Sequence, residues 1–181
     1  MINQPNVEVR ETKEENLEQI QALWNDGDVM KFVGFPDGLK ETREGMEKWY
    51  SSIKKSRPRC NHYSVFADGI GYCGETFYCI DEEHENHASL DIKLFSKARG
   101  KGIAVAALSY AIEQAFLNGA KAVWVDPNPA NEKALALYNR LGFIRKEMPD
   151  YLKEEDMDFC PVYMELAKEQ WKTIIKEKKK S

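Results

Sequence analysis

The feature that most constrains this chain is the segment Arg99–Ala104, where a strand-like run passes through two glycines into a long alanine-rich helical run. The first turn of such a helix leaves backbone N–H groups unpaired, and their partial positive charge binds phosphate. The helix has no acidic residue before Glu113, although acidic residues are favoured in a first turn. We therefore predict a phosphate-binding loop here. Its predicted residues are Arg99, Gly100, Lys101, Gly102, Ile103 and Ala104.

Two familiar phosphate-binding loops fit this segment poorly. A Walker-type loop needs a lysine and then Ser or Thr after its second glycine, but Ile103 follows Gly102. A dinucleotide-binding loop needs a third glycine where Val105 stands. It also normally opens a parallel βαβ unit, whereas this segment follows several hairpin-like strands.

A second pattern lies downstream, where a buried-looking strand ends in a loop and Asn131 opens a helix. Asn131 is a good N-cap residue. Ala134 and Tyr138 are four residues apart and share one helix face. Gly142, followed by Phe143, suits the left-handed end of a helix. Alone, this pattern would indicate an ordinary amphipathic helix–strand unit.

With both patterns in this order, the chain resembles the GCN5-related N-acetyltransferases (the GNAT superfamily). Arg99, Gly102 and Ala104 occupy the defined places of that superfamily's Gln/Arg-x-x-Gly-x-Gly/Ala signature. Asn131 and Tyr138 have the spacing of its second motif. The resemblance covers at least residues 88–166 and, more weakly, the whole chain.

Local similarities point to two different subfamilies. Asp126–Asn131 and Pro161–Met164 resemble the aminoglycoside 6′-N-acetyltransferases. Asn25-Asp26, after a first predicted helix, resembles the ribosomal-protein N-terminal acetyltransferases. The acceptor is therefore left open between a small-molecule amine and a peptide amino terminus.

The resemblance implies an α/β (α+β) fold of the GNAT type. Such a fold has a mixed, mostly antiparallel sheet of six to seven strands with helices on both faces. The fourth and fifth strands run parallel and splay apart around the cofactor. Periodicity predicts matching elements. The predicted strands are 7–11, 62–67, 70–80, 88–95, 122–126, 143–146 and 162–166. The predicted helices are 14–24, 39–55, 102–118 and 131–141, with Thr12 capping the first. Residues 25–38 are predicted to be irregular, and 167–181 to form a docked tail helix with a frayed basic end.

Composition limits the class of protein. A chain of 181 residues is expected to form one domain, 1–181. Its net charge of −4 argues against nucleic-acid binding. No apolar run approaches the length needed to span a membrane, and the amino terminus lacks the apolar core of a signal peptide, so we expect a cytoplasmic protein with no membrane contact. A homodimer is left open.

Cysteine and histidine residues indicate neither disulfides nor a metal site. The chain has no CxxC pair, and we expect all four cysteines to be reduced. They are Cys60, Cys73, Cys79 and Cys160. His84 and His87 lie in an acidic stretch that is better explained as a solvated turn than as a metal site.

The resemblance also implies the chemistry. The co-substrate would be acetyl-CoA, with its pyrophosphate on the amides of the phosphate-binding loop. An amine would attack the thioester directly in a ternary complex, while backbone N–H groups around Leu94 and Phe95 contact the oxyanion. Tyr138 would protonate the leaving thiolate, and Asn131 would contact the pantetheine arm or cap its helix.

The general base is left open among Asp91, Glu75 and a chain of water molecules. The acidic residues at 81–85 would steer a cationic acceptor towards the site. Two alternatives to a transferase are a non-catalytic acyl-CoA-binding module on the same scaffold and a nucleotide-binding regulatory domain.

Overall fold

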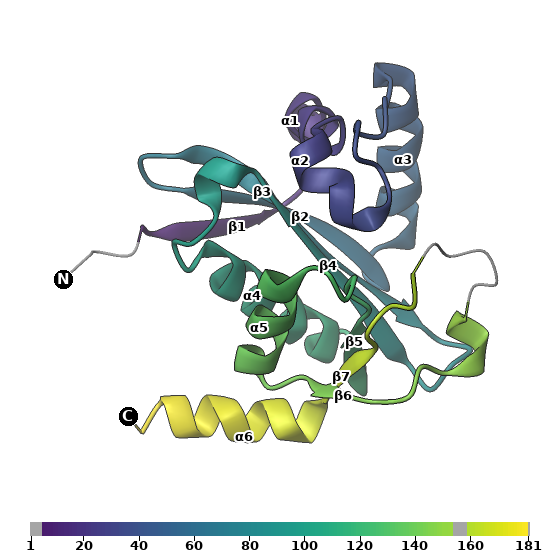
Figure 1. Cartoon of the computed structure of the whole chain (residues 1–181), viewed down its shortest axis with the longest axis vertical. Coiled ribbons are helices and arrows are strands. Elements are labelled where there is room, and N and C mark those ends of the chain that lie inside the picture. The colour runs from purple at the N-terminus through teal and green to yellow at the C-terminus, as the bar shows by residue number, and fades with distance from the viewer. Residues whose placement is uncertain (1–4, 154–158, 181) are drawn as a thin grey trace.

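The computed structural model describes residues 5–153 and 159–180. Its centre is a seven-stranded sheet of order β1-β2-β3-β4-β5-β7-β6 (Figure 1). Neighbouring strands are antiparallel except for β4 and β5, which run parallel. The GNAT-type fold is therefore confirmed. The strands are β1 Val7–Glu11, β2 Cys60–Ala67, β3 Gly71–Asp81, β4 His87–Leu94, β5 Ala122–Val125, β6 Ile144–Arg145 and β7 Met164–Ala167.

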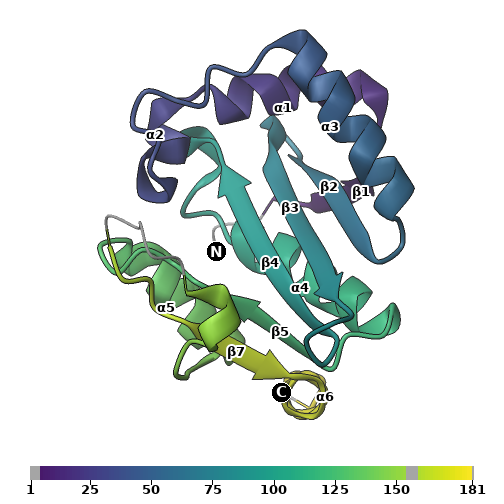
Figure 2. The ribbon, with the colours of Figure 1, turned by 90° about the vertical axis from the view of Figure 1, so that its right-hand side faces the viewer.

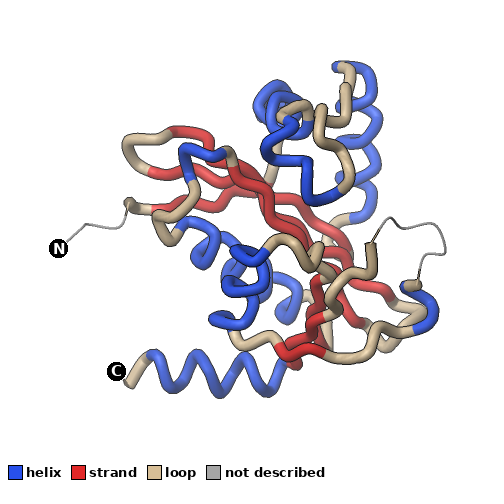
Figure 3. The backbone as a smooth tube through the Cα atoms, in the orientation of Figure 1, coloured by secondary structure: helices blue, strands red, loops and turns tan. Residues whose placement is uncertain are grey.

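Helices cover both faces of the sheet, as Figures 2 and 3 show. α1 contacts β3 and α3 contacts β2 on one face, whereas α4 packs against β1, β3 and β4 on the other. The bounds of the helices are α1 Leu17–Trp24, α2 Gly27–Met30, α3 Arg43–Ser56, α4 Ile103–Leu117, α5 Glu132–Leu141 and α6 Lys168–Lys178.

The main core lies between α4 and the sheet. Alanines at 107, 111 and 115 let α4 approach the strands closely, and Leu108 and Ile112 fill the space between them. Each large apolar side chain buried in this way contributes about 1.5–3 kcal/mol relative to exposure. This packing explains why the alanine-rich run is a central helix rather than a surface one.

β4 has two chemically different faces because side chains alternate along a strand. Ala88, Leu90 and Leu94 are buried in clusters that include α4 residues. Asp91 and Lys93 lie on the opposite face, which α1 and α3 cover. The face towards α1 and α3 therefore combines these polar side chains with an apolar cluster, in which Leu17 and Met46 pack with Tyr72 of β3.

The Thr12 cap prediction is wrong. Thr12 is fully buried, and its hydroxyl lies 2.8 Å from both His62 Nδ1 and Ser64 Oγ. Asn16 instead accepts a hydrogen bond from the Lys13 amide at 3.0 Å. His62 and Ser64 are buried polar residues, and buried polar groups require hydrogen-bond partners. The Thr12 hydroxyl is that partner, so it is not available to cap the helix.

Residues 25–38 are more ordered than predicted. They contain α2, capped by Asp26, and a single turn of 3-10 helix at Lys31–Val33. The Asn25 side chain closes the segment, because its amide donates to Glu41 O at 3.0 Å and its oxygen accepts from Glu41 N at 2.6 Å. A Cβ at Gly38 would overlap the Asn25 carbonyl, so glycine is needed for this close approach.

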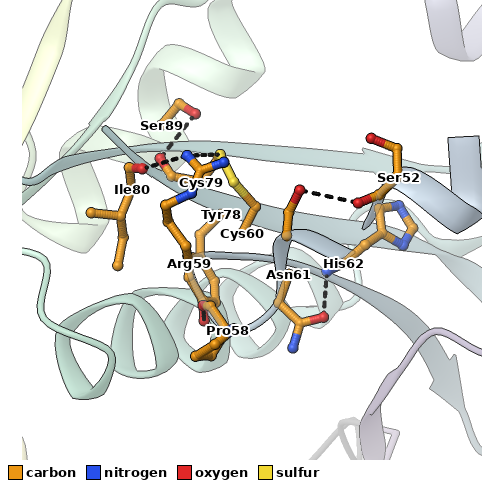
Figure 4. The surroundings of a disulfide bond; sticks show 11 residues. Ser52, Pro58, Arg59, Cys60, Asn61, His62, Tyr78, Cys79, Ile80 and Ser89 are labelled. Atoms are coloured by element: carbon orange, nitrogen blue, oxygen red, sulfur yellow. Dashed lines mark hydrogen bonds between the residues drawn. A yellow bond between two sulfur atoms is a disulfide. The ribbon is translucent and has the colours of Figure 1, made fainter. Parts of the chain in front are cut away.

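The expectation of four reduced cysteines is also wrong. Cys60 and Cys79 form a disulfide between β2 and β3 (Figure 4). They are 19 residues apart in sequence but stand directly opposite each other in the antiparallel register of the hairpin. Cys73 is buried and free, and Cys160 is exposed and free.

The tail helix docks as predicted. Trp171 is buried in the main core cluster, and Gln170 donates to the Gly142 carbonyl at 3.0 Å. Ile174 packs so close to Gly142 that a Cβ there would overlap it. Within residues 5–153 and 159–180, no helix has the length and apolar character needed to cross a membrane.

Candidate active site

The site begins where β4 and β5 stop pairing. Their parallel ladder joins only three residue pairs and ends at Ser89 and Trp124. Among the described residues, β4 has no strand partner on this side from Leu90 to Leu94, although β3 pairs with its other side throughout. Figure 2 shows the two strands diverging. The predicted splay is therefore present, and it leaves backbone groups of β4 directed away from β3.

The two residues predicted to contact the oxyanion differ in orientation. The Phe95 amide donates to Cys73 O on β3 at 2.9 Å. Because backbone groups alternate sides along a strand, the Leu94 amide points the other way, towards the diverging side. The Leu94 carbonyl accepts from Arg99 Nε at 3.0 Å. Leu94 therefore has the available N–H, and Phe95 contributes its aromatic ring, which packs edge-on against Tyr72.

The predicted phosphate-binding loop lies at the same end of β4. Gly100 and Gly102 both have left-handed backbone conformations, with φ of 74° and 78°. α4 begins at Ile103 with no capping side chain and no acidic residue in its first turn. Ile103 is buried and anchors the turn, whereas Lys101 is exposed. The N–H groups of this turn thus keep the anion-binding character that the sequence indicates.

The Arg99 side chain is occupied by protein groups. Its guanidinium donates to Asp28 Oδ2 at 3.0 Å and to Asp28 O at 3.3 Å, in addition to Leu94 O. Asn128, in the loop after β5, donates to Phe32 O at 3.4 Å. These contacts connect the segment that carries α2 to both diverging strands. No sequence pattern predicted this connection, since Asp28 and Arg99 are 71 residues apart.

α5 starts and ends as its sequence pattern predicts. Asn131 Oδ1 accepts from the Ala134 amide at 3.2 Å, so the asparagine does cap the helix. Gly142 ends it with φ of 97°. The cap uses only the side-chain oxygen of Asn131. A contact between the side-chain NH2 group and pantetheine stays a prediction.

Tyr138 is buried on α5, with its ring edge-on to Phe143 at 5.6 Å between centroids. Burial raises the pKa of its hydroxyl far above the usual value, and the carboxylates of Asp91 and Asp126 raise it further. The carboxylate of Asp91, on β4, thus acts electrostatically on the hydroxyl of Tyr138, on α5. The hydroxyl stays protonated at neutral pH and can donate a proton or a hydrogen bond.

Asp91 is the more accessible of the two predicted bases. Its side chain is 44% exposed. One oxygen accepts from the Ile92 amide at 2.7 Å, and the other forms an ion pair with Lys93. Burial would lower the pKa of Lys93, but the carboxylates of Asp91 and Glu75 outweigh it and hold that pKa above the usual value. Lys93 is therefore a cation in the folded protein.

Glu75 is enclosed, with only 4% of its side chain exposed. One oxygen accepts from Trp24 Nε1 at 2.7 Å and the other pairs with His62 Nε2 at 2.9 Å. Burial would raise its pKa, but His62 and Lys93 reverse the effect and lower it to about 2. Glu75 is thus a buried anion with both oxygens occupied. The sequence analysis did not identify Trp24, His62 or Lys93 as site residues. Their contacts with Glu75 depend on strand register and helix docking, so the only signal in the sequence was a glutamate in the middle of a predicted strand.

The acidic stretch at 81–85 lies elsewhere. It forms the turn before β4, at the end where β4 and β5 are paired, whereas the phosphate-binding loop follows the opposite end. At about 3.3 Å per residue, the length of β4 separates the two by roughly 20 Å. His84 stacks on Tyr151 at 3.7 Å in this turn. The turn does not lie beside the phosphate-binding loop, and its role in steering a cationic acceptor stays a prediction.

No group of three or more potential ligand side chains gathers as a metal site within the described ranges. His84 pairs with Asp81 at 2.7 Å, and His87 lies 3.7 Å from Glu165.

Comparisons with known proteins agree with this architecture. The family model for the acetyltransferase (GNAT) domain matches residues 6–144. No curated protein matches the chain in sequence. Solved structures similar to it include spermidine N-acetyltransferase from Vibrio cholerae in complex with CoA and spermine. The TM-score is 0.76 at 18% identity, covering 91% of this chain and 97% of that one.

Two further structures show the same fold. One is the aminoglycoside acetyltransferase AAC(6')-Ib in complex with coenzyme A, with a TM-score of 0.73 and 18% identity over 93% of this chain and 98% of that one. The other is a phosphinothricin acetyltransferase from Sinorhizobium meliloti in complex with AcCoA, with a TM-score of 0.73 and 16% identity over 89% and 88%. The family match covers more than half of the chain, and the chain belongs to the GNAT acetyltransferase family.

Proposed function

We propose that this acetyltransferase moves an acetyl group from acetyl-CoA to a primary amine of a cationic small molecule, by direct attack in a ternary complex. The observation that carries the proposal is that β4 and β5 stop pairing after Ser89 and Trp124, and that the uncapped first turn of α4 follows the free end of β4. Tyr138 adds a protonated hydroxyl and Asp91 an accessible carboxylate, the two kinds of group that aminolysis of a thioester uses.

The phosphate-binding loop supports the choice of co-substrate. The first turn of α4 has no capping side chain or acidic residue to occupy its N–H groups. The amides of residues 99–104 would hold the pyrophosphate of acetyl-CoA. Asn131 would contact the pantetheine arm, and the cofactor would run between the diverging strands towards Tyr138.

Each residue then has a distinct role. Asp91 takes the proton lost by the attacking amine, directly or through water. The Leu94 N–H stabilises the charge that develops on the thioester oxygen, an effect worth about 3 kcal/mol for a well-placed donor. Tyr138 donates a proton to the sulfur as the carbon–sulfur bond breaks. Glu75 is less suited to act as the base because both its oxygens are occupied and buried.

Two carboxylates support a cationic acceptor. Asp91 and Asp126 both act on the Tyr138 hydroxyl, and they would attract a cationic amine even though Lys93 pairs with one oxygen of Asp91. Similar structures include enzymes named for spermidine and for aminoglycosides. A peptide amino terminus is the competing acceptor.

The test is to follow free thiol release from acetyl-CoA with panels of polyamines, aminoglycosides, amino acids and peptides. We expect turnover with polycationic amines. Turnover with peptides alone would move the assignment to a protein amino terminus. CoA binding by calorimetry without turnover on any panel would favour a non-catalytic acyl-CoA-binding module.

Tyr138→Phe removes only the hydroxyl. It should lower kcat by on the order of a hundredfold, with acetyl-CoA affinity within about threefold of the wild type. Tyr151→Phe is the matched control, because Tyr151 is 43% exposed and stacks on His84 of the turn before β4. Equal activity of Tyr138→Phe and the control would remove Tyr138 from the proposed chemistry.

A further inference from the structure

A chain of polar contacts runs from the accessible Asp91 into the interior of the protein. Lys93 Nζ pairs with Asp91 on one side and lies 3.4 Å from Glu75 Oε1 on the other. The exposed fraction of the side chain falls from 44% for Asp91 to 15% for Lys93 and 4% for Glu75. A single lysine thus connects the proposed base to a buried anion.

The buried end of this chain is held from three elements. Glu75, on β3, accepts from Trp24 of α1 and pairs with His62 of β2. His62 is fixed in turn by the Thr12 hydroxyl, 2.8 Å from its Nδ1, and Thr12 contacts Ser64 at 2.8 Å. His62 and Thr12 are buried. Since every group has a partner and little room to move, Glu75 is a rigid anchor for the ammonium of Lys93.

The side chain of an unrestrained aspartate on a strand has several staggered rotamers, each of which directs the carboxylate differently. Here Lys93 restrains one oxygen and the Ile92 amide restrains the other. The charged or titratable groups around the pair are Glu75, His62 behind it, and Tyr138 and Asp126 across the diverging strands.

We propose that Lys93, anchored by Glu75, is a positioning residue that orients the Asp91 carboxylate for the acceptor amine. This inference rests on the proposed function. It assigns Glu75 a part in the reaction without contact with substrate, and it explains why the neighbouring strands β3 and β4 carry a buried glutamate–lysine pair at directly opposite positions.

The test is a double-mutant cycle in the full chain. Lys93→Met should lower kcat/KM for the acceptor by on the order of a hundredfold, as expected when a reacting group is misplaced by about 1 Å. The KM for acetyl-CoA should stay within about twofold. In an Asp91→Asn background, Lys93→Met should cause no further loss, because its effect passes through Asp91. Losses that multiply would overturn the proposal.

Controls separate positioning from folding. Lys93→Arg keeps the cation and should recover most of the activity lost in Lys93→Met. Lys48→Met makes the same change at an exposed lysine of α3 and should leave activity unchanged. If Lys93→Met fails to fold because it leaves Glu75 unpaired, Glu75→Gln/Lys93→Met removes both charges and should fold with the same loss of activity. Wild-type activity in this double variant would refute the proposal.

A structural readout keeps this inference distinct from the proposed function. If the wild-type protein acetylates no amine, the proposed function fails, whatever Lys93 does. Crystal structures of the wild type and Lys93→Met then decide the positioning role separately. We expect the Asp91 carboxylate to leave its contact with the Ile92 amide in the variant. An unchanged Asp91 rotamer would overturn the inference.

Discussion

At the scale of single residues, the site depends on how burial and charge act on a few ionisable groups. Burial keeps Tyr138 protonated. Paired charges keep Glu75 ionised against its own burial. Two carboxylates that looked equivalent as bases in the sequence are therefore different in the folded protein. Asp91 is accessible and acts electrostatically on Tyr138, whereas Glu75 is buried and pairs with Lys93, the lysine beside Asp91.

The pKa of Glu75 predicts an acid-dependent stability. Its folded value of about 2 lies below the ordinary 4.5, so its contribution is full above about pH 4.5 and is lost as the pH falls towards 2. Between about pH 6 and about pH 3, the difference in unfolding free energy between wild type and Glu75→Gln should shrink by on the order of 2 kcal/mol. Chemical denaturation at both pH values measures it. A constant difference would show that Glu75 is not held as a buried anion.

At the scale of elements, capping and glycine residues determine where several helices and turns begin or end. Asn131 caps α5 and Gly142 ends it, as their positions predict. The hairpin of β2 and β3 turns at Asp68-Gly69, also as predicted. Thr12 is the exception, because a partner 50 residues away competes for its hydroxyl.

Two glycines with similar backbone conformations allow the effect of backbone strain to be distinguished from an effect on ligand binding. Gly100 and Gly69 have φ of 74° and 75°, and a Cβ at either would meet no atom within 4 Å. Alanine at either position should lower the unfolding free energy by about 1–2 kcal/mol through the left-handed conformation alone. Only Gly100→Ala should also weaken CoA binding, measured by calorimetry. Equal affinities in the two variants would contradict a phosphate-binding role for the loop.

At the scale of the whole molecule, distant segments are joined around the site and behind it. Arg99 connects the phosphate-binding loop to α2. At the C-terminal end of the chain, α6 packs against β7 and covers the main core with Trp171. The seven-stranded order and the parallel β4–β5 pair confirm the fold implied by the two motifs.

The docking of α6 should be structural and independent of cofactor binding. Trp171→Ala should lower the unfolding free energy by about 3–5 kcal/mol, the usual cost of removing a buried tryptophan. The folded fraction should still bind CoA. Leu117→Ala is the control, since Leu117 is 77% exposed on α4 and should change stability by less than about 0.5 kcal/mol. A loss of CoA affinity in Trp171→Ala would couple α6 to the site.

The sequence by itself determined most of the elements and their order, and it indicated the loop between β4 and α4 as a phosphate-binding candidate, because glycines, caps and apolar periodicity act over a few residues. It also identified Asp91 and Tyr138 as candidates. Only the tertiary structure decided which partners each side chain has: the disulfide between Cys60 and Cys79, Thr12 beside His62, and Lys93 between Asp91 and Glu75. Strand register and helix docking bring these groups together across long separations, and no local pattern in the chain encodes such distances.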